Sequence, residues 1–363
     1  MIPLYVDLER EWRGGQSQAW LTLRGLQDLG HKAELVAARN SPLAQRTAAE
    51  GIVVHMVPRL GLRLWAALAI RRLVEGGRFA LIHVNEPHAL TAAWLAGAHR
   101  RLPLLFSRRI GFPLRRGPVS RARYGAVTEF IANCREVAQS LIESGIPTDR
   151  IVVVNEGVEV PPLPTLEMRH RARERWGVRE NEFLFGCVGF LLPEKGQRYI
   201  VQGLAQIRRE FPDARLLLAG DGPCREELEQ LARDTGQTGA VHFAGFVEDV
   251  AQVYAALDAF LFPSLFEGLG TSLQAAMAWG LPVVSTARGG LAEVVDHGRT
   301  GLVVVPDETA FASGMLRLLR DNELRRQLGQ AAREEVQRRF SASQMAANTL
   351  RVYEKIRTHG GTR

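Results

Sequence analysis

The 363-residue sequence has few cysteines, few lysines and no long apolar run. Its three cysteines, Cys134, Cys187 and Cys224, are far apart and include no CxxC pair, which favours reduced thiols over disulfides or a zinc site. The richest apolar stretch, Leu64 to Ile70, is far shorter than the ~20 residues that span a bilayer. The first residues lack the basic start and apolar centre of a signal peptide. We therefore expect a cytoplasmic protein.

The positive charge comes almost entirely from arginine, because Lys32, Lys195 and Lys355 are the only lysines. The formal net charge is +7 and the pI is about 9.8, which is typical of proteins that meet nucleic acid, an anionic membrane or an anionic substrate. The sequence has no zinc-finger spacing, RNP-like aromatic motif or dense basic helix, so we do not expect nucleic acid as a partner. Phosphorylated ligands and anionic lipid remain as candidate partners for the positive charge.

Short apolar runs alternate with helical patterns along the whole chain. This alternation is typical of parallel sheets that are covered by helices on both faces. The sequence therefore predicts an α/β protein with doubly wound, Rossmann-like sheets. The predicted strands are residues 2–6, 33–37, 52–55, 80–84, 104–107, 130–132, 151–154, 183–188, 216–219, 241–243, 259–262, 283–285 and 302–305.

A proline cluster, Pro161-Pro162-Leu163-Pro164, separates the two series of strands and can form neither a helix nor a central strand. We predict an N-terminal domain over 1–160 and a C-terminal domain over 161–340. A C-terminal helix and frayed tail, 341–363, is expected to pack back toward the N-terminal domain. Two such domains create a cleft at the carboxyl ends of their strands, where ligands of these sheets bind.

The segment Ser264 to Ser272 follows a predicted strand and opens the predicted helix 271–279. Gly268 and Gly270 let backbone N–H groups approach a ligand, and the helix start adds unpaired donors and partial positive charge. These features suit a diphosphate held by Gly268, Leu269, Gly270 and Thr271. Glu267 stands where a carboxylate accepts hydrogen bonds from sugar hydroxyls. The alternative is a plain strand–turn–helix connection with a capping acid.

A second candidate segment runs from Gly189 to Gly196 and again joins a strand to a helix. Lys195 is a compact point charge that matches a phosphate oxygen, and its presence in a lysine-poor chain favours a specific role. An isolated surface lysine is, however, usually just solvated.

Two further segments carry polar or glycine residues to strand ends. Gly14 and Gly15 precede a predicted helix over 16–29, so their loop can press against a ligand, although no GxGxxG fingerprint is present. Asn85 and Glu86 follow the strand that ends near His83. We favour these two as cleft groups, since a buried histidine after a strand is more often a satisfied core residue.

Near the C-terminus, Gly289 and Gly290 precede Glu293, which serves either as a first-turn acid of a helix or as a cleft acid. The sequence lacks D-x-D, GxSxG and HExxH motifs, so we expect neither a metal nor a cofactor.

Taken together, these segments resemble retaining glycosyltransferase family 4, also called glycosyltransferase group 1, which has the GT-B fold. The matching segments occur in the family's order and spacing over nearly the full length. They are Gly14-Gly15 with Gly30-His31, the His83 strand end, Asn155 to Glu159, Leu218 to Pro223, Pro263 to Gly270, Gly280 to Val284 and Gly289 to Glu293.

The resemblance implies that the C-terminal domain binds a nucleotide sugar and the N-terminal domain binds the acceptor. It implies that Lys195 and the Gly268–Thr271 loop hold the diphosphate, with Glu267 on the donor sugar. Lys195, the helix start and the Gly14-Gly15 amides could stabilise the leaving diphosphate without a metal. We accordingly place Glu267, Lys195 and Asn85 in the catalytic site. Gly14, Gly15, Gly189 and Glu293 join the donor site, while Glu86, Arg108 and Arg109 lie on the acceptor side.

Three positions depart from the family's pattern. The family's second glutamate, which hydrogen-bonds to the ribose hydroxyls, is replaced here by Ala275, with Gln274 beside it. The family's arginine after Gly189 is replaced by Phe190, and its frequent second histidine by Asn85. Loss of a charged hydrogen bond costs roughly 1.5–3 kcal/mol. An impaired relative that serves as a binding or scaffolding subunit is therefore the main alternative to an active enzyme. A nucleotide-sugar epimerase is a third hypothesis, but the Glu267 and Glu293 motifs favour a transferase over an epimerase.

The acceptor domain is rich in arginine. Arg109 and five further arginines cluster with Phe112 and Tyr124, and Trp65 lies in the basic, apolar stretch from Arg59 to Arg72. We hypothesise that this surface meets anionic lipid or a phosphorylated lipid-linked glycan on the inner face of a bacterial cell membrane, as in lipopolysaccharide synthesis. A solvated arginine-rich surface is the alternative. The other arginines of this cluster are Arg108, Arg115, Arg116, Arg121 and Arg123.

Overall fold

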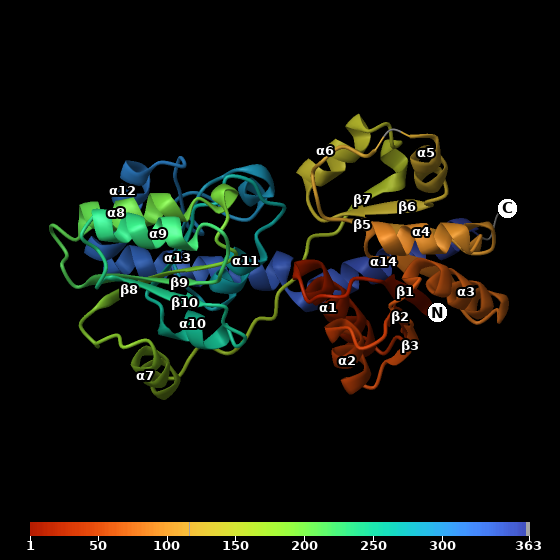
Figure 1. The fold of residues 1–363 in the computed structure, drawn as a ribbon, viewed down its shortest axis with the longest axis horizontal. Coiled ribbons are helices and arrows are strands. Elements are labelled where there is room, and N and C mark those ends of the chain that lie inside the picture. Colours follow the sequence, from red (N-terminus) through yellow and green to blue (C-terminus); the bar gives the residue numbers. More distant parts are fainter. Residues whose placement is uncertain (116, 361–363) are drawn as a thin grey trace. The chain divides into compact units, whose positions relative to one another are not determined.

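The structure is a computed structural model that describes residues 1–115 and 117–360 (Figure 1). The chain forms two compact units. Unit 1 contains Met1–Gly157 and the segment that starts at Phe340, and unit 2 contains Val158–Arg339. The chain thus leaves unit 1 just before the proline cluster and returns to it near the predicted start of the C-terminal helix.

Unit 1 is built on a seven-stranded parallel sheet in the order β3-β2-β1-β4-β5-β6-β7. Its central strands are buried along their whole length, as continuous apolar runs require. The strands are β1 Pro3–Asp7, β2 Glu34–Ala38, β3 Val53–Val57, β4 Leu81–Val84, β5 Leu104–Arg108, β6 Glu129–Ala132 and β7 Ile151–Val153. The helices are α1 Gly14–Asp28, α2 Pro42–Ala49, α3 Leu62–Glu75, α4 Pro87–Leu95, α5 Pro118–Gly125, α6 Arg135–Glu143 and α14 Ala342–Gly360.

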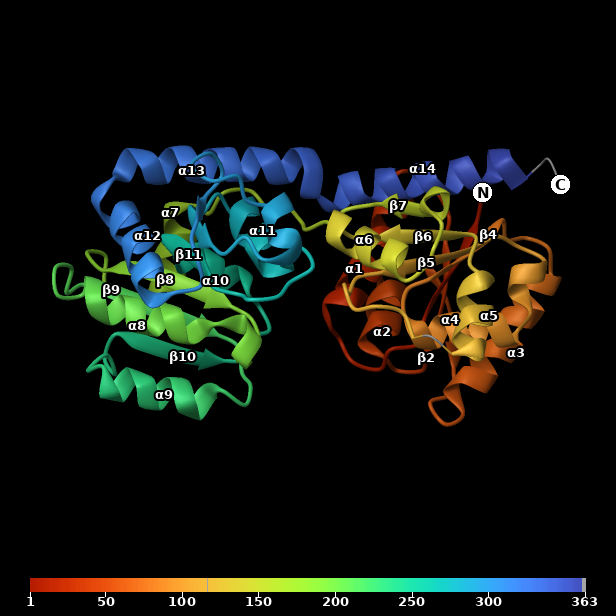
Figure 2. The same ribbon diagram turned by 90° about the horizontal axis from the view of Figure 1, so that it is seen from above.

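Unit 2 is built on a six-stranded parallel sheet in the order β10-β9-β8-β11-β12-β13. Helices α8 and α12 lie side by side against this sheet (Figure 2). The strands are β8 Phe183–Val188, β9 Ala214–Ala219, β10 Val241–Gly245, β11 Ala259–Phe262, β12 Val283–Ser285 and β13 Leu302–Val303. The α-helices are α7 Leu166–Arg175, α8 Gln197–Ile207, α9 Arg225–Asp234, α10 Ala251–Ala256, α11 Thr271–Ala278, α12 Glu308–Arg320 and α13 Asn322–Glu335.

Each of the thirteen predicted strand positions coincides with a strand, so the predicted fold class is confirmed. One local prediction is wrong. Helix α1 begins at Gly14, so the paired glycines belong to its first turn rather than to a loop. Helix α13 ends at Glu335 and a π-helical turn, Val336–Phe340, follows it. Helix α14 ends at Gly360, and residues 361–363 of the predicted tail lie outside the described part of the chain.

Helix α14, blue in Figure 1, packs on α1 of unit 1. Contact is close enough that a side chain at Gly25 would collide with the Ala346 methyl group. In the described part of the chain, no helix has the length and apolarity that a membrane crossing requires.

The strand orders fix where ligands meet each sheet. In unit 1 the order reverses between β1 and β4, and in unit 2 it reverses between β8 and β11. Open parallel sheets bind ligands beyond the carboxyl ends of the strands at such a reversal. Asp7 is the last residue of β1, and the predicted residues Asn85 and Glu86 follow β4, while the predicted segments from Gly189 and from Pro263 follow β8 and β11. The predicted site residues therefore flank both reversal points.

Candidate functional site

In unit 2, helix α11 starts directly from the glycine-containing loop after β11. Gly270 is its N-cap residue and has φ of 65°, a left-handed conformation that favours glycine. A Cβ atom there would come within 2.9 Å of both Leu291 Cδ2 and Phe262 Cε1. The first amides of α11 have no intrahelical acceptor, because every helix start leaves its first N–H groups unpaired. Gly270 thus shapes a helix start that can bind an anion.

The turn that carries Lys195 is docked on the loop after β11. Lys195 closes a 3-10 turn, Pro193–Lys195, and the N–H of Leu265 donates to the carbonyl of Glu194 at 2.8 Å. Gly196 has φ of 67°, and a side chain there would collide with the Pro263 carbonyl oxygen. The two loops therefore lie in one fixed arrangement.

This docking brings Lys195 and Glu267 together. The Lys195 ammonium donates to Glu267 Oε1, and Ser264 Oγ donates to the same oxygen at 3.3 Å. Both charged side chains are largely but not fully buried, with 24% and 17% of their surfaces exposed. An ammonium, a carboxylate and a helix start therefore share one partly open site. Such a set can bind a diphosphate through the cation and amides, and sugar hydroxyls through the carboxylate.

Gly189 and Phe190 occupy the loop between β8 and the Lys195 turn. The Gly189 N–H donates to the Ala219 carbonyl at 3.0 Å, and the Phe190 carbonyl accepts from Gln197 Nε2 at 2.9 Å. The Phe190 ring is 65% exposed. This loop is thus held by its backbone, while its side chain at 190 points into solvent and supplies no positive charge.

The glycine pair 289–290 supports the same site. The Gly290 N–H donates to the Glu267 carbonyl at 3.2 Å. Glu293 is the last residue of the 3-10 turn Gly289–Glu293, whose first turn contains no acid. The interpretation of Glu293 as a first-turn acid is therefore wrong, and its role toward a donor stays a prediction.

Ala275 and Gln274 lie in the first two turns of α11. Gln274 is fully buried, and neither Nε2 nor Oε1 has a hydrogen-bond partner among the described residues. A buried amide without partners costs roughly 1–3 kcal/mol.

Cys187 lies near Lys195 and Glu267. Burial raises the pKa of the Cys187 thiol to about 12, so this sulfur is protonated and not a nucleophile.

In unit 1, a buried polar network links the ends of β1 and β4 to the start of α1. Asp7 is fully buried; its carboxylate accepts from Asn85 Nδ2 at 2.6 Å and from Gln16 Nε2 at 3.0 Å. Asn85 Nδ2 also donates to the Gly15 carbonyl at 3.0 Å. Burial raises the pKa of Asp7. Asn85 is only 3% exposed, so its contact with a substrate stays a prediction while its hold on the Gly14-Gly15 helix start is direct.

Glu86 caps helix α4. Its carboxylate accepts from the N–H groups of His88, Ala89 and Leu8, the last two at 2.6 and 3.2 Å. Burial, reinforced by the Asp7 charge, raises the pKa of Glu86 to about 7. Glu86 therefore joins β1 to α4 and can change protonation near neutral pH.

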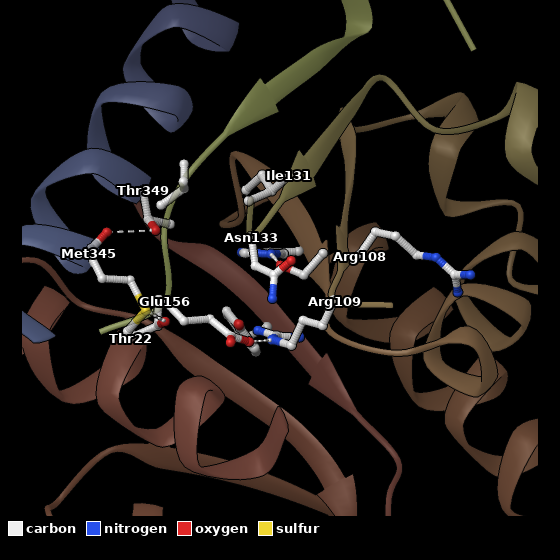
Figure 3. Close-up of a pocket in the computed structure, with 12 residues that line it drawn as sticks. Thr22, Arg108, Arg109, Ile131, Asn133, Glu156, Met345 and Thr349 are labelled. Carbon is white, nitrogen blue, oxygen red and sulfur yellow. Dashed lines mark hydrogen bonds and ion pairs between the residues drawn. The ribbon is translucent and has the colours of Figure 1, made fainter. Parts of the chain in front are cut away.

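Arg109 lies beside a small cavity of about 20 Å³ (Figure 3). Its side chain extends toward Glu156 and forms an ion pair at 2.8 Å, whereas the Arg108 guanidinium points away. Asn133 is 4% exposed and its Oδ1 lines this cavity without a partner among the described residues. A space of this size holds about one water molecule.

His83 is a satisfied core residue, as expected. Its Nδ1 lies 2.6 Å from Tyr353 Oη and its Nε2 lies 2.7 Å from Ser107 Oγ. Burial, with a smaller contribution from the Arg109 charge, lowers the pKa of His83 to about 3. The neutral imidazole therefore joins the sheet to α14.

The predicted arginine cluster lies on β5, α5 and the loop between them. Arg123 Nη1 donates to Thr91 Oγ1 at 2.8 Å, and Arg108 Nη2 donates to the Phe112 carbonyl at 2.8 Å. Arg115 and Arg121 are exposed, and Arg116 lies outside the described residues.

Sequence reasoning missed Asp7, Gln16 and Glu156. A carboxylate at the end of a buried first strand, as Asp7 is, was the available signal. In the described residues, no three His, Cys, Asp or Glu side chains group together as metal ligands would.

Comparison with known proteins identifies the family. The model for glycosyl transferases group 1 matches residues 168–335, and the model for glycosyltransferase family 4 matches residues 12–160. A GDP-mannose-dependent α-(1-6)-phosphatidylinositol monomannoside mannosyltransferase of Mycobacterium tuberculosis is 32% identical over 280 residues, which cover 72% of this chain and 71% of the relative.

Two further similarities concern sequence and fold. N-acetyl-α-D-glucosaminyl L-malate synthase of Bacillus anthracis is 35% identical over 185 residues, 51% of this chain; the chain spans about half of that relative's length, 48%. The crystal structure of Anabaena HepE with UDP-glucose has a TM-score of 0.83 at 22% identity and covers 98% of this chain and 100% of HepE. The chain has the GT-B fold and belongs to the group 1, family 4 glycosyltransferases.

Proposed function

We propose that the protein is an enzyme that transfers a sugar from a nucleotide-diphosphate-sugar to a glycan or lipid-linked acceptor, with retention of anomeric configuration. The observation that carries the proposal is the Lys195–Glu267 pair beside the glycine-shaped start of α11. Unit 2 would hold the donor through this set of groups. HepE was crystallised with UDP-glucose and the mycobacterial relative is named as GDP-mannose-dependent, which supports a nucleotide sugar as donor.

In this mechanism, Lys195 exchanges its carboxylate partner for the donor's diphosphate, and Glu267 turns to the sugar hydroxyls. The bond between the anomeric carbon and the phosphate oxygen breaks, and negative charge grows on the leaving diphosphate. Lys195 and the amides at Gly270 and Thr271 stabilise that charge. The acceptor oxygen forms the new bond on the same sugar face, and its proton passes to the leaving phosphate oxygen. No metal or cofactor is required in this scheme.

The acceptor would bind to unit 1 at the ends of β1, β4 and β5. Glu86 offers carboxylate oxygens there, and Arg108 and Arg109 offer positive charge. Asn85 acts as a positioning residue, because it ties Asp7 to the Gly14-Gly15 helix start.

The test is nucleoside diphosphate release from a panel that includes UDP-glucose and GDP-mannose, with wild type and Glu267→Gln. Donor-dependent release that falls at least about 100-fold in Glu267→Gln supports the proposal. Equal release by both proteins would overturn the role of Glu267. The anomeric configuration of the product, read from its proton NMR coupling, tests retention.

A binding or scaffolding subunit is the second candidate. Ala275 and the exposed Phe190 favour it, since neither can supply the charged contact typical of the family at its position. Tight binding of a nucleotide sugar by calorimetry, with no release from any donor or acceptor, would support this candidate.

The cellular setting we propose is bacterial cell-envelope synthesis, such as that of lipopolysaccharide, with a cytoplasmic protein peripheral on the inner face of the cell membrane. The phosphatidylinositol-mannoside acceptor in the name of the mycobacterial relative supports a lipid-linked acceptor.

A further inference from the structure

The positive charge of the chain is concentrated in one part of unit 1. Residues 51–128 contain 13 arginines, no lysine and only two acids, Glu75 and Glu86, a net charge of +11. The whole chain carries +7, so the remaining residues are net negative. This part includes α3, α4 and α5, which lie together in Figures 1 and 2.

Apolar side chains are exposed on the same elements. Leu64 and Leu68, one helical turn apart on α3, are 65% and 50% exposed, and Trp65 beside them is 53% exposed. Leu60, in the turn before α3, is 90% exposed. We call these four residues, with Arg59, Arg63, Arg71 and Arg72 around them, the α3 face. Such a combination of aliphatic, tryptophan and arginine side chains on one helix is typical of an interfacial membrane helix.

A groove lies at the start of this face. It has a volume of about 450 Å³ and is lined by Leu60 and Leu64 with three arginines and one acid, Glu9. The guanidinium groups contact neutral partners. Arg10 donates to the Arg59 carbonyl, Arg59 to the Arg39 and Asn40 carbonyls, and Arg63 to the neutral His88 ring.

The neutral state of His88 follows from its environment. Burial, together with the Arg63 charge, lowers the pKa of His88. The groove therefore keeps a net positive charge beside exposed leucines, which suits a phosphate attached to an acyl chain.

We infer that the α3 face docks on an anionic lipid bilayer, with Leu60, Leu64, Trp65 and Leu68 in the interface and the surrounding arginines on lipid phosphates. The positive charge of the α3 face, together with its exposed apolar side chains, favours an anionic bilayer over other partners. A second copy of the chain would bring two strongly positive surfaces together, and nucleic acid would leave four exposed apolar side chains without a partner. The inference deepens the membrane association proposed above and has its own test.

The test is sedimentation of the full-length protein with vesicles of phosphatidylcholine alone or with one quarter phosphatidylglycerol. We expect binding to the anionic vesicles, weaker binding to the neutral ones, and a loss with rising salt as charges are screened. Each arginine near an anionic surface contributes about fivefold in partition. Arg63→Gln with Arg72→Gln should therefore reduce binding about 25-fold, and Arg209→Gln, on exposed unit 2 surface, should not.

The apolar contribution has a matched control. Leu64→Gln with Leu68→Gln should reduce binding to anionic vesicles at least about tenfold, whereas Leu166→Gln, 76% exposed in unit 2, should leave it unchanged. Trp65→Phe should remove the blue shift of tryptophan emission that vesicles cause in wild type. Equal binding to both vesicle types, equal loss in the unit 2 controls, or binding of duplex DNA without vesicle binding would overturn the inference.

The outcome is independent of the transfer reaction. Release of nucleoside diphosphate without vesicles should be the same in wild type and in the α3 variants. Vesicle binding without any release of nucleoside diphosphate would support this inference and count against the proposed function. Release of nucleoside diphosphate without vesicle binding would support the proposed function and overturn this inference.

Discussion

The two units place polar groups at equivalent points of similar sheets, but they hold them differently. In unit 2, glycines allow close approach to the backbone: Gly196 meets the Pro263 carbonyl, and Gly270 meets the side chains of Phe262 and Leu291. In unit 1, side chains fill this role, since Asn85 and Gln16 both donate hydrogen bonds to the Asp7 carboxylate. Unit 2 thus keeps its charged pair at a partly open site, whereas unit 1 satisfies most of its polar groups internally.

The two sites should therefore respond differently to substitution. A site made of close backbone contacts tolerates little added volume, while a site made of buried polar side chains is sensitive to loss of a single hydrogen bond.

Lys195→Ala removes the cation of the unit 2 site. We expect the rate of nucleoside diphosphate release to fall about 10²–10³-fold, because loss of one preorganised donor to developing negative charge costs about 2.7–4 kcal/mol. The matched control is Lys32→Ala, an exposed lysine of unit 1, which should leave the steady-state rate unchanged. A rate for Lys195→Ala within twofold of wild type would contradict the assigned role.

Gly270→Ala and Gly15→Ala compare the glycines of the two units. The first should cost about 1–3 kcal/mol of unfolding free energy, because φ is 65° and the methyl group meets Leu291 and Phe262. The second should leave stability unchanged or raise it by up to about 1 kcal/mol, because nothing lies within 4 Å of the new methyl group in a helix. Urea unfolding measures both.

The same pair tests ligand approach in unit 1. If the donor reaches the Gly14-Gly15 helix start, Gly15→Ala should slow nucleoside diphosphate release despite its intact stability. A full rate in Gly15→Ala would remove these glycines from the donor site.

Tyr353→Phe removes the hydroxyl group that meets His83 Nδ1. We expect a loss of about 1–3 kcal/mol in unfolding free energy, since a buried nitrogen is left without a partner. Nucleotide binding, followed by calorimetry, should not change, because neither residue belongs to the proposed donor site. Weaker nucleotide binding with unchanged stability would contradict the structural role of His83.

Glu86→Gln should flatten the dependence of stability on pH. Burial raises the pKa of Glu86 to about 7 from a usual 4.5, so between these values the native state binds more protons than the unfolded state. Wild-type stability from this group is therefore greatest at low pH and falls as pH rises from about 4.5 to 7. Urea unfolding at pH 5 and 7 should show a smaller difference in the variant; an identical difference would exclude Glu86 as the titrating group.

The sequence predicted much of the fold because buried parallel strands are continuous apolar runs. The segments after β8 and β11 could also be predicted, because the glycines at 196 and 270 mark positions where the backbone has a positive φ. The resemblance to glycosyltransferase family 4 placed Lys195 and Glu267 in one site, because β8 and β11 become neighbours only in the folded sheet.

The hydrogen bonds and the ion pair of unit 1 could not be predicted from the sequence in the same way. Asp7 lies 78 residues from Asn85, and Arg109 is far from Glu156 in sequence, so their contacts depend on sheet order and rotamers rather than on local pattern. The start of α1 at Gly14 was also missed, because glycine normally disfavours a helix and the hydrogen bond from Asn85 to the Gly15 carbonyl is not visible in the local sequence.

The most direct test of the central claim is a crystal structure of the full chain with a nucleoside diphosphate. We predict diphosphate oxygens within hydrogen-bond distance of Lys195 Nζ and of the Gly270 or Thr271 amide, with the Lys195–Glu267 contact broken. A diphosphate bound elsewhere on the chain, with that ion pair intact, would contradict the account.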